Sequence, residues 1–254
     1  MKEKDVYHYG NGSPGPLLQK TTTNYNSFTT PIHAGGPSIF DQPSQTIVYD
    51  GSGNRVAETD YAYDGSATQG VAGLPAGTHD ETNYPSGSGI VRGNLTTKTE
   101  QCFVLPPATG SCSNTVTQYM YDETGQVVSM TDPRNNTTQY IYADNYASGT
   151  GTPSGDTNAY LTELILPSTN GVSHVEHFTY GYSDGQIRVA QDENSQNTSY
   201  AYNDPLARLT ETDFPDGGKT TIAYNDAAPT PSVTKTTLIT AIITLTPPLF
   251  FAKV

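Results

Sequence analysis

A motif of paired tyrosines recurs along the middle of the chain, and it constrains the fold more than any other feature. In the best copies two tyrosines are separated by one residue, and an aspartate follows directly or within two positions. The spacing is 21 residues from Tyr119 to Tyr140 and 20 residues from Tyr180 to Tyr200. A fixed period of this length is the signature of a repeat architecture, in which each unit is one supersecondary element.

Each unit has the pattern of a strand, a turn and a second strand. Tyrosines two positions apart lie on one face of a strand, because side chains alternate between faces. The aspartate can accept a hydrogen bond from the backbone two residues on, and a nearby glycine supplies a positive φ, so the chain reverses there. The unit is therefore predicted to be a β-hairpin. The residues assigned to the motif are Tyr49, Asp50, Gly53, Arg55, Tyr61, Tyr63, Asp64, Tyr119, Tyr121, Asp122, Gly125, Tyr140, Tyr142, Asp144, Tyr180, Tyr182, Asp184, Tyr200, Tyr202, Asp204, Arg208, Leu209 and Tyr224.

The composition favours an all-β fold with a small core. Only 34% of the residues are hydrophobic, whereas 18 residues are tyrosine. A tyrosine ring buries a large area while its hydroxyl keeps a partner or water. Because a lone hairpin is marginally stable, successive hairpins are expected to pair edge to edge, with tyrosines packed in cross-strand ladders. We expect a sheet that is wet on one or both faces rather than a thick two-layer core.

The tandem unit Tyr-x-Tyr-Asp-x-x-Gly-x-Leu/Val, with Thr-Asp-Pro-x-x-Asn between copies, resembles the YD repeat of the Rhs family. This family includes bacterial polymorphic toxins, the insecticidal toxin-complex shell subunits and the teneurins. The best copies lie at residues 119–144 and 180–226. The glycine and the arginine of the consensus are not both present in any copy after the first, since residues 125–127 lack the arginine and residues 206–209 lack the glycine.

The resemblance implies tandem β-hairpins in a spiralling antiparallel sheet, as a segment of an Rhs-type shell. It implies a non-catalytic structural role, in which the shell encapsulates or presents a C-terminal toxin or effector domain that is absent from this chain. The implied partners are further YD repeats and that effector, and the family is secreted or found at the cell surface. The alternative function is a cell-surface recognition module, in which the many tyrosines bind carbohydrate or another protein.

Three regions are distinguished along the chain. Residues 1–44 form a degenerate or irregular N-terminal segment, and residues 45–226 form the repeat region, with loop insertions near 65–92 and 145–158. Residues 227–254 are an atypical apolar tail whose only charges are Lys235 and Lys253. The tail is either a docking strand with a different role, or the product of a shifted reading frame, or disordered.

Charge and hydropathy exclude several classes of partner. Twelve basic residues against 25 acidic residues leave a net charge of −13, so a nucleic-acid partner is not expected. No stretch is long and apolar enough to span a membrane, and no apolar segment follows Met1 as in a secretory signal.

Formal matches to catalytic motifs have structural explanations. Ser183 lies in a Gly-x-Ser-x-Gly pattern, but a strand pattern follows it where a nucleophile elbow needs a helix. The sequence Gly218-Lys219-Thr220 resembles the end of a phosphate-binding loop, but Asp213 stands where the first glycine belongs. We therefore predict no catalytic and no cofactor-binding residue.

Metal ligands are not predicted either. His174 and Glu176 would share one face of a strand while His177 points to the other, so the three would not converge. The loop of residues 50–54 has oxygen donors suited to calcium but lacks a further carboxylate. The remaining histidines are scattered along the chain at His8, His33 and His79.

Cys102 and Cys112 are the only cysteines, and they flank a segment with two prolines and a glycine. An even pair on either side of a turn favours a disulfide across a hairpin in an exported protein. The alternative is a pair of free buried thiols.

Overall fold

A computed structural model describes residues 1–26, 39, 41–87, 89–104, 110–227 and 229–239. Contacts divide the chain into two units, the first with Met1–Asp144 and Pro153–His174, the second with Asn145–Thr152 and Val175–Val254. His33 and the part of the apolar tail from residue 240 onward lie outside the described residues.

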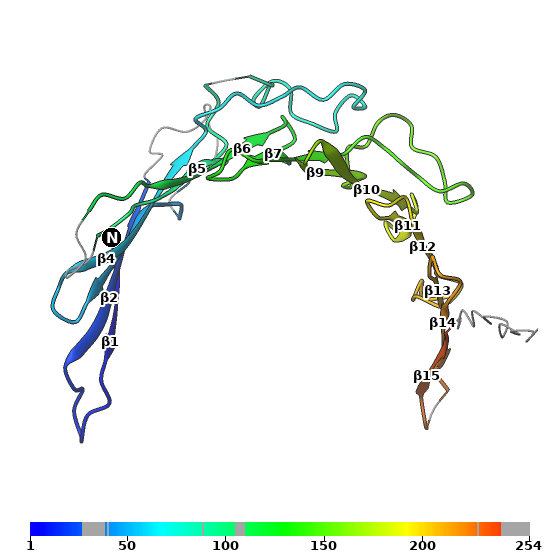
Figure 1. The fold of residues 1–254 in the computed structure, drawn as a ribbon. Coiled ribbons are helices and arrows are strands. Elements are labelled where there is room, and N and C mark those ends of the chain that lie inside the picture. Colours follow the sequence, from blue (N-terminus) through cyan, green and yellow to red (C-terminus); the bar gives the residue numbers. More distant parts are fainter. Residues whose placement is uncertain (27–38, 40, 88, 105–109, 228, 240–254) are drawn as a thin grey trace, which may run out of the picture. The chain divides into compact units, whose positions relative to one another are not determined.

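The fold is all-β and antiparallel, as predicted. In the described residues strands follow one another in sheet order as they do in the sequence (Figure 1). The strands of the first unit are β1 (Lys2–Tyr7), β2 (Leu17–Tyr25), β3 (Pro43–Asp50), β4 (Arg55–Tyr63), β5 (Leu95–Glu100), β6 (Thr115–Tyr121), β7 (Val127–Thr131), β8 (Thr137–Ile141) and β9 (Glu163–Thr169). The others are β10 (Val172–Tyr180), β11 (Ile187–Gln191), β12 (Asn197–Ala201), β13 (Glu211–Asp213), β14 (Lys219–Asn225) and β15 (Ser232–Leu238).

Four of the short hairpin turns share one geometry, which is set by an aspartate at their first position. At Asp50, Asp122, Asp132 and Asp192 the carboxylate accepts hydrogen bonds from the backbone N–H groups two and four residues later. The residue three positions later has a positive φ, which is 85° at Gly53. This is a three-residue hairpin loop ending in a left-handed residue, the geometry that the Asp-x-x-Gly pattern predicts.

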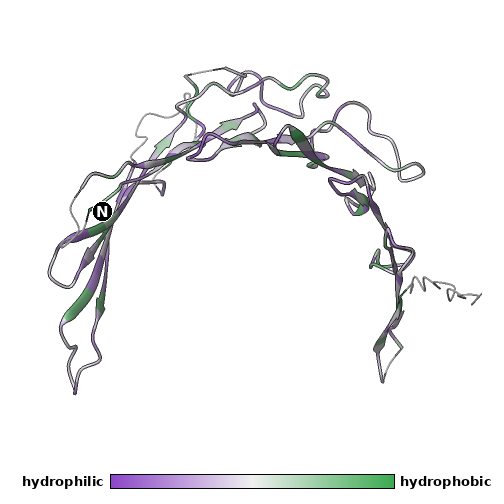
Figure 2. Ribbon diagram, viewed as in Figure 1, coloured by the Kyte–Doolittle hydropathy of each residue, from purple (hydrophilic) through white to green (hydrophobic). Residues whose placement is uncertain are grey.

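The sheet has almost no apolar core. Among the described residues Ile47 is the only buried hydrophobic side chain. The buried polar residues are Thr22, Glu58, Thr96, Asp122, Glu123, Thr138, Thr162, Thr212 and Thr220. Hydrophobic and hydrophilic positions are interspersed along the strands (Figure 2). Stability in such a sheet depends on hydrogen bonds and on pairwise side-chain contacts between neighbouring strands.

Both flanking segments contain regular structure. In the N-terminal segment β1 pairs with β2, whose β-branched run Thr21-Thr22-Thr23 suits a strand. In the tail Ser232–Leu238 forms β15, which pairs with β14 along seven register positions from Asn225 to Lys219. A search of the described residues for a helix able to cross a membrane finds none.

Candidate functional site

A Leu-Thr pair recurs at the start of the strand that follows the tyrosine motif. The hydroxyls of Thr96, Thr162 and Thr210 donate to the carbonyl of the middle residue of the preceding Tyr-x-Tyr motif, over 3.2, 3.2 and 3.0 Å. The acceptors are Ala62, Ile141 and Ala201. These bonds tie each returning strand to the motif before it. The sequence signal is the repeated Leu-Thr pair at 95–96, 161–162 and 209–210.

The second tyrosine of the motif makes the matching link. Its hydroxyl donates to a carbonyl at or just before the start of the preceding strand, over 2.9 to 3.2 Å. The pairs are Tyr63 with Pro43, Tyr121 with Leu95, Tyr142 with Val127 and Tyr224 with Leu209. Burial raises the pKa of the Tyr63, Tyr121 and Tyr142 hydroxyls, so they remain donors.

The backbone carbonyls of Leu95 and Leu209 therefore link neighbouring strands. Each carbonyl accepts the tyrosine hydroxyl of the following strand, while the next residue, Thr96 or Thr210, donates to the preceding motif. One dipeptide thus connects both neighbouring strands. The tyrosine hydroxyls therefore donate hydrogen bonds to backbone carbonyls, in addition to the packing of the rings.

Arginines clamp two of the repeat turns in the second unit. The Arg208 guanidinium forms two hydrogen bonds of 2.8 Å with Asp204, and it also binds Asp226. It lies over the Tyr224 ring, 4.0 Å from the centroid. Arg188 repeats the arrangement with Asp184 and the Tyr202 ring.

Asp204 is expected to titrate far below an ordinary aspartate. Hydrogen bonds from Arg208 lower its pKa from 3.8 to about 2. Because the folded pKa is depressed, the ion pair stabilises the fold above about pH 4, and this contribution disappears as the pH falls through about 2. Carboxyl-carbon NMR titration should give a midpoint of about 2 for Asp204.

The Arg208→Gln variant should move the Asp204 midpoint back toward 3.8. The matched control is Arg188→Gln, which removes an equivalent clamp from another turn and should leave the Asp204 midpoint unchanged. A midpoint near 3.8 in the unaltered protein would show that the Arg208 contact does not persist in solution.

The aspartate of the motif also closes each of the two long insertions, as Asp64 in the first and Asp144 in the second. The Asp64 carboxylate accepts from the N–H groups of Arg92, Gly93 and Asn94, where the first insertion returns to the sheet. Asp144 accepts from the N–H and the hydroxyl of Thr157, where the second insertion returns. Each insertion is thus an expanded turn that keeps its aspartate as the acceptor.

Within the first unit the insertions contact each other and a repeat turn. The Asp156 N–H donates to the Gly73 carbonyl over 3.1 Å. Gln69 forms a parallel bridge with Asp122. Gly73 has a φ of 83°, and a Cβ there would lie 1.9 Å from an Asp156 carboxylate oxygen, so the close approach requires glycine.

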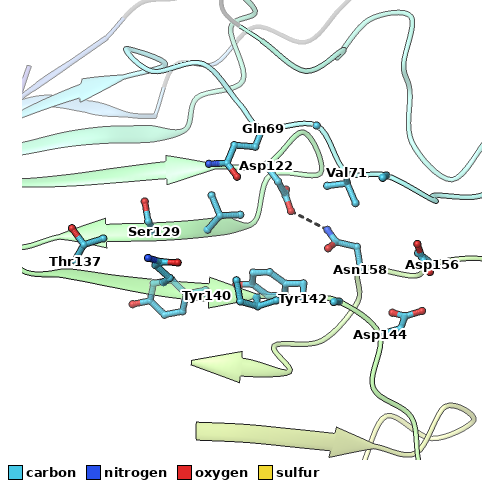
Figure 3. Close-up of a pocket in the computed structure, with 16 residues that line it drawn as sticks. Gln69, Val71, Asp122, Ser129, Thr137, Tyr140, Tyr142, Asp144, Asp156 and Asn158 are labelled. Carbon is cyan, nitrogen blue, oxygen red and sulfur yellow. Dashed lines mark hydrogen bonds between the residues drawn. The ribbon is translucent and has the colours of Figure 1, made fainter. Parts of the chain in front are cut away.

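These contacts enclose a depression of about 720 Å³ on the sheet (Figure 3). Its floor is formed by β7 and β8, including Ser129, Thr137 and Tyr140. Its rim is formed by the two insertions and the turn at Asp122. The surface combines an aromatic ring with hydroxyl, amide and carboxylate groups, which is the chemistry of a polar ligand site.

Two of the carboxylates that line the depression, those of Asp122 and Asp144, are already engaged. Asp122 is 3% exposed and accepts from the N–H and the hydroxyl of Thr124, from the Gln126 N–H and from the Asn158 amide. Asp144 is bound to Thr157. Their hydrogen bonds hold turns and insertions in place.

The other motif residues lie in strands or at their ends. Arg55 pairs with Glu58, and Tyr182 is 38% exposed, with its ring 5.2 Å from that of Tyr146. Gly125 has a φ of 90° in the turn after Asp122. Tyr49 in β3 directly precedes Asp50 and so holds the second position of its motif copy. The first tyrosines of the other copies are Tyr61 in β4, Tyr119 in β6, Tyr140 in β8, Tyr180 in β10 and Tyr200 in β12.

Residues that had matched catalytic motifs occupy turns and strands. Ser183 lies in the turn before β11, and Gly218 donates its N–H to Asp216 at the start of β14. His174 lies in β10, with a ring nitrogen 2.6 Å from the Thr169 hydroxyl.

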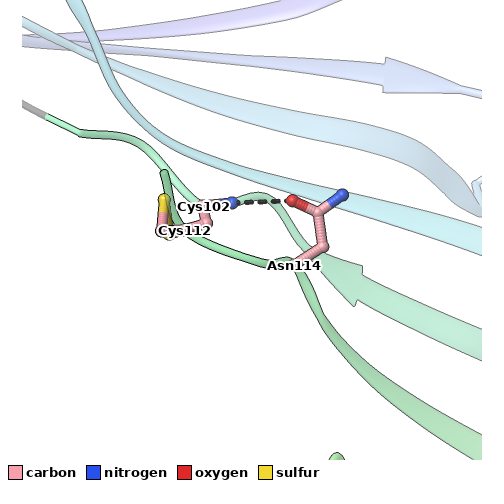
Figure 4. Close-up of a disulfide and its surroundings, with 3 residues drawn as sticks. All are labelled: Cys102, Cys112 and Asn114. Atoms are coloured by element: carbon pink, nitrogen blue, oxygen red, sulfur yellow. Dashed lines mark hydrogen bonds between the residues drawn. A yellow bond between two sulfur atoms is a disulfide. The ribbon is translucent and has the colours of Figure 1, made fainter. Parts of the chain in front are cut away.

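The two cysteines form a disulfide, with Cα atoms 5.7 Å apart (Figure 4). The Cys102 N–H also donates to the Asn114 side chain over 3.0 Å. The bridge closes the connection between β5 and β6, part of which, residues 105–109, lies outside the described residues.

One cluster was missed by the sequence reasoning. His79 and Glu81, from the first insertion, lie together with Glu123 from the turn between β6 and β7. Nothing in the spacing of these residues indicates that they meet, because the insertion has no periodic pattern.

No family model matches the chain, and no curated protein matches it. Among solved structures, it is similar to TcdB2-TccC3 without the hypervariable C-terminal region, at 15% identity and a TM-score of 0.42, covering 87% of this chain and 11% of that one. A Photorhabdus luminescens Tc holotoxin pore with a mutation in TccC3 matches at 16% identity and a TM-score of 0.40, over 84% and 10% of the two chains. A TcdB2-TccC3-Cdc42 complex matches at 16% identity and a TM-score of 0.41, over 83% and 10%.

This chain therefore spans about a tenth of the length of the chains it resembles.

Proposed function

We propose that the chain is a non-catalytic structural segment of a YD-repeat wall, which encloses or presents a C-terminal toxin or effector domain. The observation that carries the proposal is the repeated hydrogen-bond network between successive strands. Tyrosine hydroxyls and Leu-Thr pairs serve as the same connectors at several strand junctions. A sheet connected in this way is extended by adding units, with no need for a central core.

The terminal strands support a role as one segment of a longer sheet. In the described residues β1 pairs only with β2, and β15 pairs only with β14. Every residue of these two strands is exposed. Such edges present unpaired backbone groups, onto which another strand can add. The partner that fits them is a further repeat hairpin, and a secreted or cell-surface toxin assembly is the setting that the resemblance suggests.

The test is hydrogen exchange on the full chain, with and without a synthetic peptide of residues 197–225, which contains β12, β13 and β14. We expect slower exchange of backbone amides in β1, in β15 or in both, because an added strand satisfies their free edges. The control is the same peptide carrying Thr221→Pro, which breaks its pairing. Unchanged exchange in both edge strands would contradict the proposal.

A second candidate function is recognition of a carbohydrate or a protein at the depression. It is favoured by the Tyr140 ring, which lies beside the polar groups of Gln69 and Ser129 on one concave surface (Figure 3). In the same exchange measurement with neutral oligosaccharides, this function predicts protection around β7 and β8 and leaves the edge strands unaffected.

A further inference from the structure

Three potential metal ligands meet where the first insertion folds back onto the sheet. His79, Glu81 and Glu123 each offer one ligand atom, and these atoms all lie within 4.8 Å of one another. Two of the residues come from the insertion and the third from the hairpin turn between β6 and β7. A ligand bound by all three would connect the insertion to the repeat sheet.

Glu123 is the fixed member of the cluster. It is 5% exposed, its N–H donates to the Gln69 carbonyl over 2.8 Å, and its carbonyl accepts from Arg92 over 2.6 Å. One carboxylate oxygen accepts the Val71 N–H. A buried carboxylate is stabilised by hydrogen-bond donors or by a cation.

The charged and titratable groups around Glu123 come from Glu81, His79 and Arg92. Glu81 brings a second carboxylate, and the Arg92 guanidinium donates instead to the carbonyls of Tyr84, Pro85 and Glu123. His79 lies beside Glu81, with Nδ1 and Oε1 3.0 Å apart, and its side chain is 14% exposed. With a neutral imidazole the cluster carries two negative charges, which one divalent cation would balance.

We propose that His79, Glu81 and Glu123 bind a divalent transition-metal ion, for which Zn²⁺ is the best fit. Zinc accepts imidazole nitrogen together with carboxylate oxygen, and three protein ligands leave a fourth position for water. Calcium and magnesium prefer sites made of oxygen donors alone. Bound metal would hold the insertion against the turn at Glu123, beside the depression that both of them border.

The test is isothermal titration calorimetry of the untagged full chain with Zn²⁺. We expect one ion per chain. The variants Glu81→Gln and His79→Gln should each weaken binding at least about tenfold, because each removes a ligand. The matched controls are Glu193→Gln and His8→Gln, which change the same residue types outside the cluster and should bind as the unaltered chain does.

Circular dichroism must show unchanged β-structure in all four variants, so that a loss of binding reflects lost ligands. Titration with Co²⁺ gives a second readout, because an ion in a four-coordinate site has visible absorption that the Glu81→Gln variant should weaken. Absence of Zn²⁺ binding would overturn the proposal. Binding that is equal in the variants and the controls would overturn it as well.

Discussion

Replacing both Cys102 and Cys112 with serine is expected to lower the free energy of unfolding by about 3 kcal/mol. The bridge joins residues that are ten positions apart in the connection between β5 and β6. Without it the unfolded chain gains the entropy of that open loop. The effect is large because the sheet has only one buried hydrophobic residue among those described, so little else restrains these strands. Urea denaturation followed by circular dichroism measures the loss.

The control is the unaltered protein in a reducing buffer, which opens the same loop without changing a side chain. It should unfold at the same urea concentration as the double variant. Two alkylatable thiols in the protein before any reductant is added would contradict the disulfide itself. An unchanged unfolding midpoint in the double variant would contradict its contribution to stability.

Asp122→Ala is expected to cost about 3 kcal/mol or more, the largest loss for any single repeat aspartate. Its carboxylate is 3% exposed and accepts from the N–H and the hydroxyl of Thr124, from the Gln126 N–H and from the Asn158 side chain. Alanine removes the acceptor of these part-buried hydrogen bonds, at about 1 to 3 kcal/mol for each group that stays unsatisfied. It also removes one of the hydrogen bonds that join the β6–β7 turn to the second insertion.

The matched control is Asp192→Ala. Asp192 begins a turn of the same geometry, but it is exposed, and water can replace its bonds to the Asn194 and Gln196 N–H groups. We expect a loss of about 1 kcal/mol there. Equal losses in the two variants, measured by urea denaturation, would show that the burial of Asp122 and its bond to Asn158 contribute nothing.

The turns were predictable because their determinants are local. An aspartate followed three positions later by a residue with a positive φ specifies the reversal within five residues, as at Asp50 and Gly53. The alternation of the flanking strands is equally local. For these reasons the all-β antiparallel fold followed from the periodicity of the tyrosine motif.

The contacts between residues far apart in the sequence were not predictable in the same way. The Tyr121 hydroxyl donates to the Leu95 carbonyl across 26 positions of sequence. Glu123 meets His79 across an insertion without periodicity. Such contacts depend on where a loop returns, which local patterns do not encode. The repeated Leu-Thr pair was nevertheless a visible signal, because it recurs at 95–96, 161–162 and 209–210.

The aspartates at the base of the two insertions make loop length independent of sheet geometry. Asp64 receives residues 92–94 with the same carboxylate that, in a short turn, receives residues only two and four positions away. A segment of different length or composition can therefore be exchanged there without moving a strand, provided that its last residues return to the carboxylate. The outer loops of such a protein are free to diversify under selection, and they are natural positions for grafting foreign peptides, while the framework beneath them stays constant.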